Sequence, residues 1–152
     1  MAKDKIDRKK ILSILSRILE AELAGVVRYT HYSFMVFGYN RIPIVSWLRA
    51  QANESLAHAQ QAGEMITSLG EHPSLGIGPL LETHKHEIGQ ILTEALENEQ
   101  QGLELYRELF ELVEGRSIVL EEYARAMIAA EEMHAFEVDK MLRKPGEVGT
   151  SR

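Results

Sequence analysis

Four long segments of the chain carry apolar residues at every third or fourth position, and this pattern limits the fold more than any other feature. The segments cover residues 7–38, 43–70, 80–113 and 117–142. Such spacing places the apolar side chains on one face of an α-helix. Almost no alternating stretch remains that could form a β-strand. We therefore predict an all-α protein in which four helices share one core.

The lengths of the connections predict how these helices are arranged. Only a few residues, around Asn40 and around Gly115, join the first helix to the second and the third to the fourth. Each pair should therefore form an antiparallel hairpin. Between the hairpins, residues 70–79 are rich in glycine and proline. Extended, ten residues span roughly 33 Å, whereas a helix of 30 residues is roughly 45 Å long, so with fraying at its ends this segment can join the hairpins as one long crossover.

The length of 152 residues suggests one domain. We expect an N-terminal extension at residues 1–6, the bundle at 7–142, and a disordered tail at 143–152 with no fifth helix. The chain has no cysteine and a net charge of −6. The first feature excludes disulfides and thiolate metal sites and agrees with a cytoplasmic location. The second argues against a nucleic-acid-binding protein, and no stretch is long enough for a membrane span.

The two hairpins contain the same motif of chemically active residues. Glu-x-x-Gly-x-x-x-Tyr occurs at residues 22–29 and again at 99–106. In each hairpin a second glutamate lies 32 residues after the first, and a histidine follows it three or four residues later. Counted from the turns, these side chains lie at similar depth in the bundle. They are Glu22, Glu54, His58, Glu99, Glu131 and His134.

The positions of these glutamates predict a metal site. Glu22, Glu99 and Glu131 replace apolar residues in the helical stripes, and glutamate is seldom buried without a partner. Four inward carboxylates would repel one another, whereas two divalent ions would balance their charge. Carboxylates with a few imidazoles suit iron or manganese. We therefore predict two metal ions bound between the helices, with Glu131 bridging them.

Two arguments disagree about the second helix. The 32-residue spacing makes Glu54 the counterpart of Glu131, but the apolar stripe turns Ser55 and His58 inward and leaves Glu54 about 100° around the helix from Ser55. We predict Glu54 as a ligand because four carboxylates balance two divalent ions and three do not. A π-bulge near residues 54–58 would bring the pair into position.

Residues 11–142 resemble the bacterioferritin branch of the ferritin family. The resemblance lies in the segment 22–29, in Leu-Glu-Asn-Glu at 96–99, and in Glu-x-x-His at 131–134. It implies a ferritin-like four-helix bundle that holds two iron ions per chain, with manganese as an alternative. It further implies oxidation of Fe(II) by O2 or peroxide, for iron storage or detoxification. Tyr29 falls where the family has a tyrosine beside the di-iron site, and its repeat counterpart is Tyr106.

Three departures from the family pattern limit the resemblance. The second helix reads Glu-x-x-x-His instead of Glu-x-x-His, the haem-binding methionine is replaced by Leu56, and the fifth helix is missing. We therefore expect no haem and no 24-subunit cage held by fifth helices. A homodimer is the minimum assembly that we expect, with a smaller shell left open.

Two alternatives stay open at this stage. A DNA-protecting mini-ferritin would use the basic N-terminal residues, and a rubrerythrin-like peroxidase or manganese enzyme would use the same bundle. We do not expect nucleic-acid binding, because a basic run at a chain end is usually just solvated. The basic residues are Lys3, Lys5, Arg8, Lys9 and Lys10.

Overall fold

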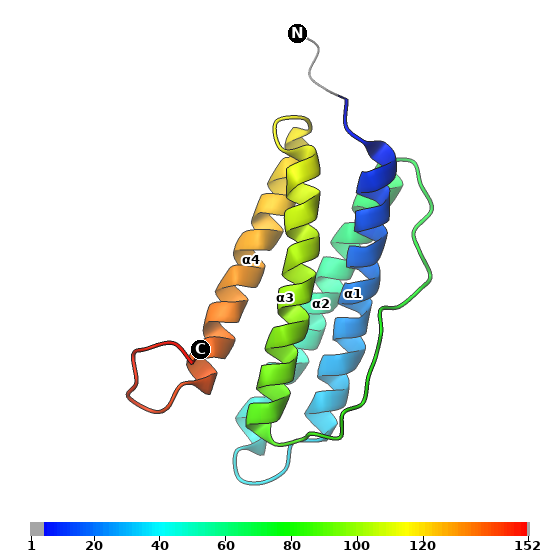
Figure 1. Ribbon diagram of the computed structural model, residues 1–152. Helices are drawn as coiled ribbons and strands as arrows, with labels where there is room; N and C mark the ends of the chain where they lie inside the picture. Colours follow the sequence, from blue (N-terminus) through cyan, green and yellow to red (C-terminus); the bar gives the residue numbers. More distant parts are fainter. Residues whose placement is uncertain (1–4, 152) are drawn as a thin grey trace.

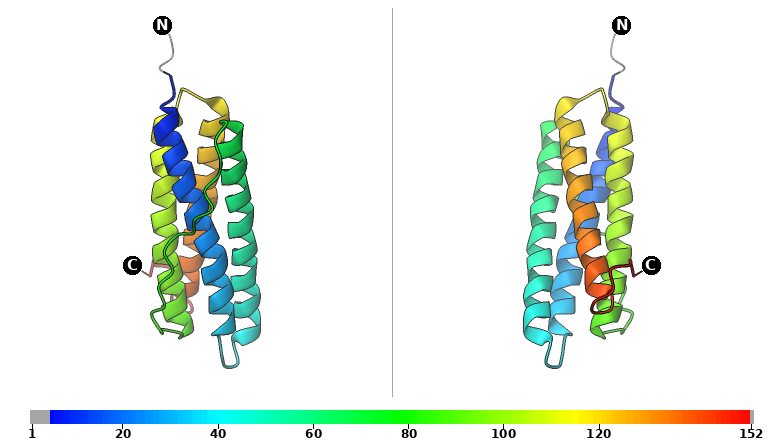
Figure 2. Two further views of the ribbon diagram at one scale, coloured as in Figure 1. Left: turned by 90° about the vertical axis from the view of Figure 1, so that its right-hand side faces the viewer. Right: turned by 90° about the vertical axis from the view of Figure 1, so that its left-hand side faces the viewer.

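The computed structural model describes residues 5–151, and the only regular elements in that range are four α-helices (Figure 1). They are α1 (Arg8–Phe34), α2 (Arg41–Ser68), α3 (Ile88–Val113) and α4 (Ile118–Leu142). The helices lie side by side as a four-helix bundle (Figure 2). This confirms the all-α class, and within residues 143–151 no further helix follows α4.

Short turns make α1 with α2, and α3 with α4, antiparallel hairpins. Gly38 and Gly115 lie in these turns with φ of 96° and 70°, a backbone conformation that glycine adopts without steric cost. The Ser117 side chain then caps α4 by accepting a hydrogen bond from the Leu120 N–H at 3.4 Å. The two predicted hairpins are therefore confirmed.

The crossover covers residues 69–87 and runs down the outside of the bundle beside α1 (Figures 1 and 2). It is fixed to α1 by the Gly78 N–H, which donates to the Glu20 carbonyl at 2.9 Å, and by Arg28, which donates to the Pro79 carbonyl at 3.2 Å. The third helix begins at Ile88 and not at Leu80 as predicted. The longer extended segment is needed because ten residues are too few to span the bundle.

The interior consists of apolar clusters separated by a polar layer. One cluster, near the start of α1, contains Leu15, Ile18 and Leu109, all at most 1% exposed. A second cluster lies toward the α1–α2 turn and contains Leu48 and Ile91. The helical positions between the clusters hold the predicted glutamates and histidines. The apolar clusters thus fix the four helices on either side of these polar side chains.

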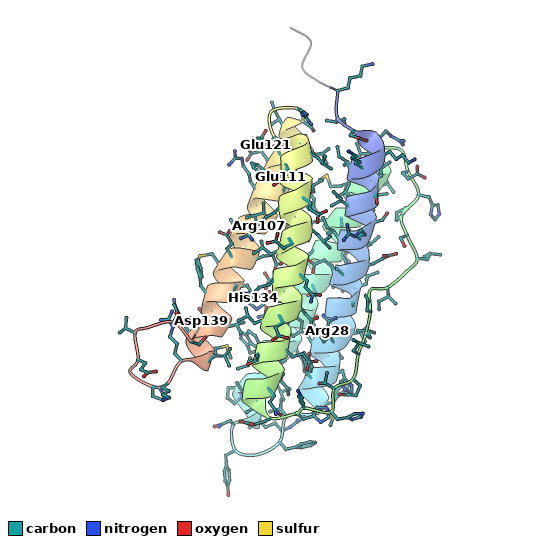
Figure 3. The ribbon with its side chains drawn as sticks, viewed as in Figure 1. Arg28, Arg107, Glu111, Glu121, His134 and Asp139 are labelled. Carbon is teal, nitrogen blue, oxygen red and sulfur yellow. The ribbon has the colours of Figure 1, made fainter. Side chains whose placement is uncertain are left out.

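Residues 143–151 form a loop that returns to α4 near Asp139, which Figure 3 labels. The Ser151 N–H donates to Asp139 Oδ1 at 3.1 Å, and Arg143 donates to the Val148 carbonyl at 2.8 Å. Disorder of this tail in solution stays a prediction, and most of the predicted extension 1–6 lies outside the described residues. No helix in the described range has the length and apolar character of a membrane span.

Candidate metal centre

Five of the six predicted ligand residues meet at mid-bundle, one or two from each helix. His58 Nδ1 lies 3.2 Å from Glu131 Oε1 and 3.6 Å from Glu22 Oε1. His134 Nδ1 lies 3.0 Å from Glu99 Oε2, and Figure 3 shows His134 on α4 near the middle of the bundle. All five side chains are at most 13% exposed. The sequence repeat therefore predicted this convergence.

The five residues form two groups of three that share one member. Glu22, His58 and Glu131 make the first group, and Glu99, Glu131 and His134 make the second. Within each group, ligand atoms lie within 4.8 Å of one another. Because Glu131 belongs to both groups, its carboxylate lies between two potential ion positions.

Glu54 does not join either group. Its side chain is 46% exposed, and its carboxylate lies 3.8 Å from Nε2 of His58, on the ring nitrogen opposite the one that faces Glu22 and Glu131. Helix α2 continues as a regular α-helix through residues 54–58, so the predicted π-bulge is absent there. Ser55 is instead buried, and an added Cβ at Gly25 would lie only 2.9 Å from its Oγ. The apolar stripe was thus the better guide to which residue faces inward.

Each of the two predicted tyrosines donates a hydrogen bond to a glutamate that belongs to only one of the ligand groups. The Tyr106 hydroxyl donates to Glu22 Oε1 at 2.8 Å, and the Tyr29 hydroxyl donates to Glu99 Oε1. Burial, followed by the charge of these glutamates, raises the pKa of both hydroxyl groups above the usual range for tyrosine. Both tyrosines therefore stay protonated and orient the carboxylates as hydrogen-bond donors.

Trp47 is a neighbour of the site that was not among the predicted site residues. Its ring packs edge-on against the His134 ring, with ring centroids 5.7 Å apart, and against the Tyr29 ring, with ring centroids 6.4 Å apart. Trp47 lies eight residues before Ser55 on α2, a spacing that places both on one helical face. The sequence therefore already indicated that Trp47 lies on the same face of α2 as Ser55. The tryptophan forms an apolar wall beside the second group.

Comparison with protein families identifies the chain at this point. The sequence model of the ferritin-like domain matches residues 12–146. The chain belongs to the ferritin-like family. A search of curated proteins found no match to the ferritin-like chain.

Solved structures with the same fold agree with this assignment. A ferritin-like diiron-carboxylate protein from Bacillus anthracis has a TM-score of 0.84 at 22% identity, covering 90% of this chain and 98% of that one. A dodecameric thioferritin from Bacteroides fragilis has a TM-score of 0.81 at 20% identity, covering 91% and 87%. Rhodobacter capsulatus bacterioferritin has a TM-score of 0.79 at 23% identity, covering 93% and 86%. At these identities the likeness shows the fold alone.

Burial and neighbouring charges shift the pKa values of four residues of this site in the ferritin-like chain. Burial alone would lower the pKa of His58, but the nearby carboxylates of Glu131 and Glu22 raise it to about 10. Burial raises the pKa of Glu131 to about 7 against the lowering effect of His58. Burial opposes charge on His134 and Glu99 as well, yet their mutual contact raises the pKa of His134 and lowers that of Glu99. The site therefore holds protons that an incoming cation must displace.

Two cavities of the ferritin-like chain that share lining residues lie at this site and next to it. A small cavity of about 50 Å³ is lined by Glu22, Glu99 and Glu131, among others. An outer cavity of about 620 Å³ lies between α1, the crossover and α3. Arg28 and Gly102 line both cavities. A small ion or O2 entering the outer cavity is thus only a few side chains away from the buried carboxylates.

Proposed function

We propose that this ferritin-like protein binds two Fe(II) ions per chain at mid-bundle and oxidises them with O2, for iron storage or detoxification. The observation that carries the proposal is Glu131, which belongs to two groups of three potential ligands. A carboxylate in this position can bridge two cations. Family membership supports iron as the metal, and manganese fits the same donor atoms.

The donor set fits a pair of divalent cations. Three carboxylates and two imidazoles would give each ion oxygen and nitrogen ligands of the kind that iron binds. The three carboxylates carry a charge of −3 against +4 for two divalent ions, so one further anion, such as hydroxide, would neutralise the site. Iron supplies the redox chemistry, one electron from each ion. The protein side chains hold the ions together, and Tyr29 and Tyr106 fix the carboxylates.

We propose a positioning role for Glu54 in place of the predicted direct ligation. A histidine that binds a metal through one ring nitrogen commonly donates its other N–H to a carboxylate. Glu54 lies on the Nε2 side of His58, while Nδ1 faces the other carboxylates. Closing the 3.8 Å gap by a small side-chain rotation would make that hydrogen bond.

Variants on α2 separate these two roles. Glu54→Ala should weaken metal binding roughly 10- to 100-fold, as is typical when such a supporting carboxylate is lost, without changing the number of ions bound. Ser55→Glu should tighten binding, because it adds an inward carboxylate at the buried position. The measurement is anaerobic Fe(II) titration. If Glu54→Ala instead removed one ion per chain, Glu54 would be a direct ligand as the sequence predicted.

The proposed activity is tested by adding Fe(II) to the metal-free protein in an oxygen electrode. We expect about two Fe(II) bound per chain and O2 consumption that follows their oxidation. His72→Ala is a suitable control, because His72 is exposed on the crossover, where its Nδ1 lies 2.9 Å from the Pro73 carbonyl oxygen. Peroxide consumption without O2 uptake would favour the rubrerythrin-like alternative. A folded protein that binds two ions but shows no O2 consumption and no peroxide consumption would contradict the proposal.

We propose that the chain forms at least a homodimer. Phe34, Phe37 and Ile42 at the α1–α2 end are 56%, 72% and 83% exposed, which is apolar surface that a partner can cover. Tyr32, another aromatic residue of α1, is buried and donates to Glu94 at 2.7 Å, so it cannot contribute to this contact. Light scattering at micromolar concentration should give a dimer or a larger shell. A monomer at that concentration would contradict this proposal.

The DNA-protecting alternative gains little from the basic N-terminus. Lys3 lies outside the described residues. Two hydrogen bonds at 2.8 and 3.2 Å join the Arg8 guanidinium to the Leu69 carbonyl, and Lys10 lies 3.8 Å from Asp7. These side chains are thus partly engaged within the chain.

A cytoplasmic location, suggested by the absence of cysteine, belongs to the proposal as well.

A further inference from the structure

Two histidines and a glutamate meet on the surface, where the crossover passes α1. His31 Nε2 lies 2.6 Å from Glu82 Oε2, and His86 Nε2 lies 3.3 Å from Glu82 Oε1. Ligand atoms of the three residues lie within 4.8 Å of one another. His31 comes from α1, whereas Glu82 and His86 come from the end of the crossover. The cluster therefore joins two segments that are about 50 residues apart in sequence.

The backbone conformation at His84 is part of this arrangement. His84 has φ of 55°, an unusual value for a residue with a side chain, and its N–H donates to Glu82 Oε1 at 2.6 Å. With this backbone conformation the His86 ring reaches Glu82, four residues earlier in the crossover. The side chains of His31, Glu82 and His86 are 49%, 37% and 24% exposed, so solvent ions can reach them.

We propose that His31, Glu82 and His86 form a second metal site that binds one divalent transition-metal ion and thereby ties the crossover to α1. Two imidazoles and one carboxylate with open positions are a common ligand set for Zn(II) and Fe(II). Bonds of about 2.1 Å to one ion place cis donor atoms roughly 3 to 3.5 Å apart. The His86 contact with Glu82, at 3.3 Å, has this spacing, and the His31 contact, at 2.6 Å, would lengthen by a few tenths of an ångström.

This site is separate from the mid-bundle centre. His31 lies nine residues beyond Glu22 on α1, which is about 14 Å of helix. Its residues also take no part in the proposed iron oxidation. The inference therefore stands or falls independently of the proposed function.

Zinc is a suitable probe because it has no redox chemistry. Zn(II) bound per chain is measured by equilibrium dialysis of the full-length protein, as wild type, as the His31→Ala/His86→Ala double variant and as His72→Ala. We expect wild type and His72→Ala to bind one Zn(II) per chain more than the double variant. The mid-bundle centre is intact in all three proteins, so it contributes equally to each count.

A protease can show where this extra ion lies. Lys85, which is exposed between His84 and His86, is the only lysine or arginine in residues 70–87 and gives trypsin one cleavage site there. Zn(II) at ten times its dissociation constant should slow cleavage after Lys85 about tenfold in wild type. The double variant should be cleaved at the same rate with and without zinc. Trypsin activity on an unrelated peptide controls for an effect of zinc on the protease itself.

The variant Glu82→Gln keeps the size of the side chain and guards against a folding defect. It should lose the extra zinc while its helical circular dichroism and Fe(II) oxidation stay as in wild type. Equal zinc counts in wild type and in the two cluster variants would overturn the proposal, because the three residues would then form only ion pairs with one another. Zinc protection of Lys85 that persists in the double variant would overturn it too, since the ion would lie elsewhere.

Discussion

Glu131→Gln is expected to abolish binding of both metal ions and all Fe(II) oxidation at the mid-bundle centre. Glu131 is the one residue that both ligand groups share, so its loss removes a ligand from each ion. Loss of a supporting carboxylate costs roughly 10- to 100-fold in metal affinity, and loss of a bridging ligand should cost more than about 100-fold. Anaerobic titration and the oxygen electrode measure the two effects.

The neighbouring Glu132→Gln is a matched control for this variant. Glu132 lies on the same turn of α4, is 43% exposed, and forms an ion pair with Arg107 at 3.2 Å. Its substitution should leave metal binding and oxidation unchanged. Wild-type oxidation by Glu131→Gln, or an equal loss in Glu132→Gln, would contradict the assignment.

The stability of Glu131→Gln separates loss of a ligand from loss of the fold. Burial raises the pKa of Glu131 to about 7, above its value in an unfolded chain. Its contribution to stability is therefore present at low pH and is lost as the pH rises through about 7. The metal-free variant should thus be at least as stable as metal-free wild type at pH 8. Thermal unfolding of both proteins without metal is the measurement.

The affinity for metal is expected to fall steeply as the pH falls, because each ion must displace protons from its ligands. The pKa of His58 in the metal-free site is about 10, so its proton alone makes the affinity fall about tenfold per pH unit below that value. Glu131 adds roughly another tenfold per unit below pH 7. His134, whose pKa is also raised, steepens the dependence further.

Calorimetry in buffers with different ionisation enthalpies counts the released protons directly. At pH 6, about one proton more should be released per chain than at pH 8, because Glu131 becomes protonated between these values. The double variant His31→Ala/His86→Ala is the right background, since it removes the proposed surface site from the titration. An affinity that does not change with pH would contradict a metal-free site that holds protons.

Much of the fold and of the site follows from periodicity in the sequence. Helices α1, α2 and α4 begin and end within four residues of the predicted limits. The start of α3 was wrong because Leu80 and Leu81 seemed to continue an apolar stripe, whereas they are 43% and 83% exposed on the crossover. Local periodicity does not show that these residues are needed to span the bundle.

At the site, the 32-residue spacing predicted the depth of five ligands, and the apolar stripe predicted which residue of α2 faces inward. The 32-residue repeat predicted that Glu22, Glu99 and Glu131 meet. Because the two hairpins have helices of similar length, positions with the same spacing lie at the same depth in the bundle. Both the spacing and the argument that four carboxylates must balance two ions favoured Glu54. The charge argument ignored protons on the histidines and any anion from solvent. The surface cluster around Glu82 had no sequence signal, since it depends on how the crossover passes α1.

The most direct test of the mid-bundle centre is anomalous diffraction at the iron edge, from crystals loaded with Fe(II) without oxygen. We predict two peaks per chain inside the bundle. One should lie between Glu22, His58 and Glu131, and the other between Glu99, Glu131 and His134. A single peak, or iron found only on the surface of a well-ordered bundle, would contradict a two-iron centre in this ferritin-like protein.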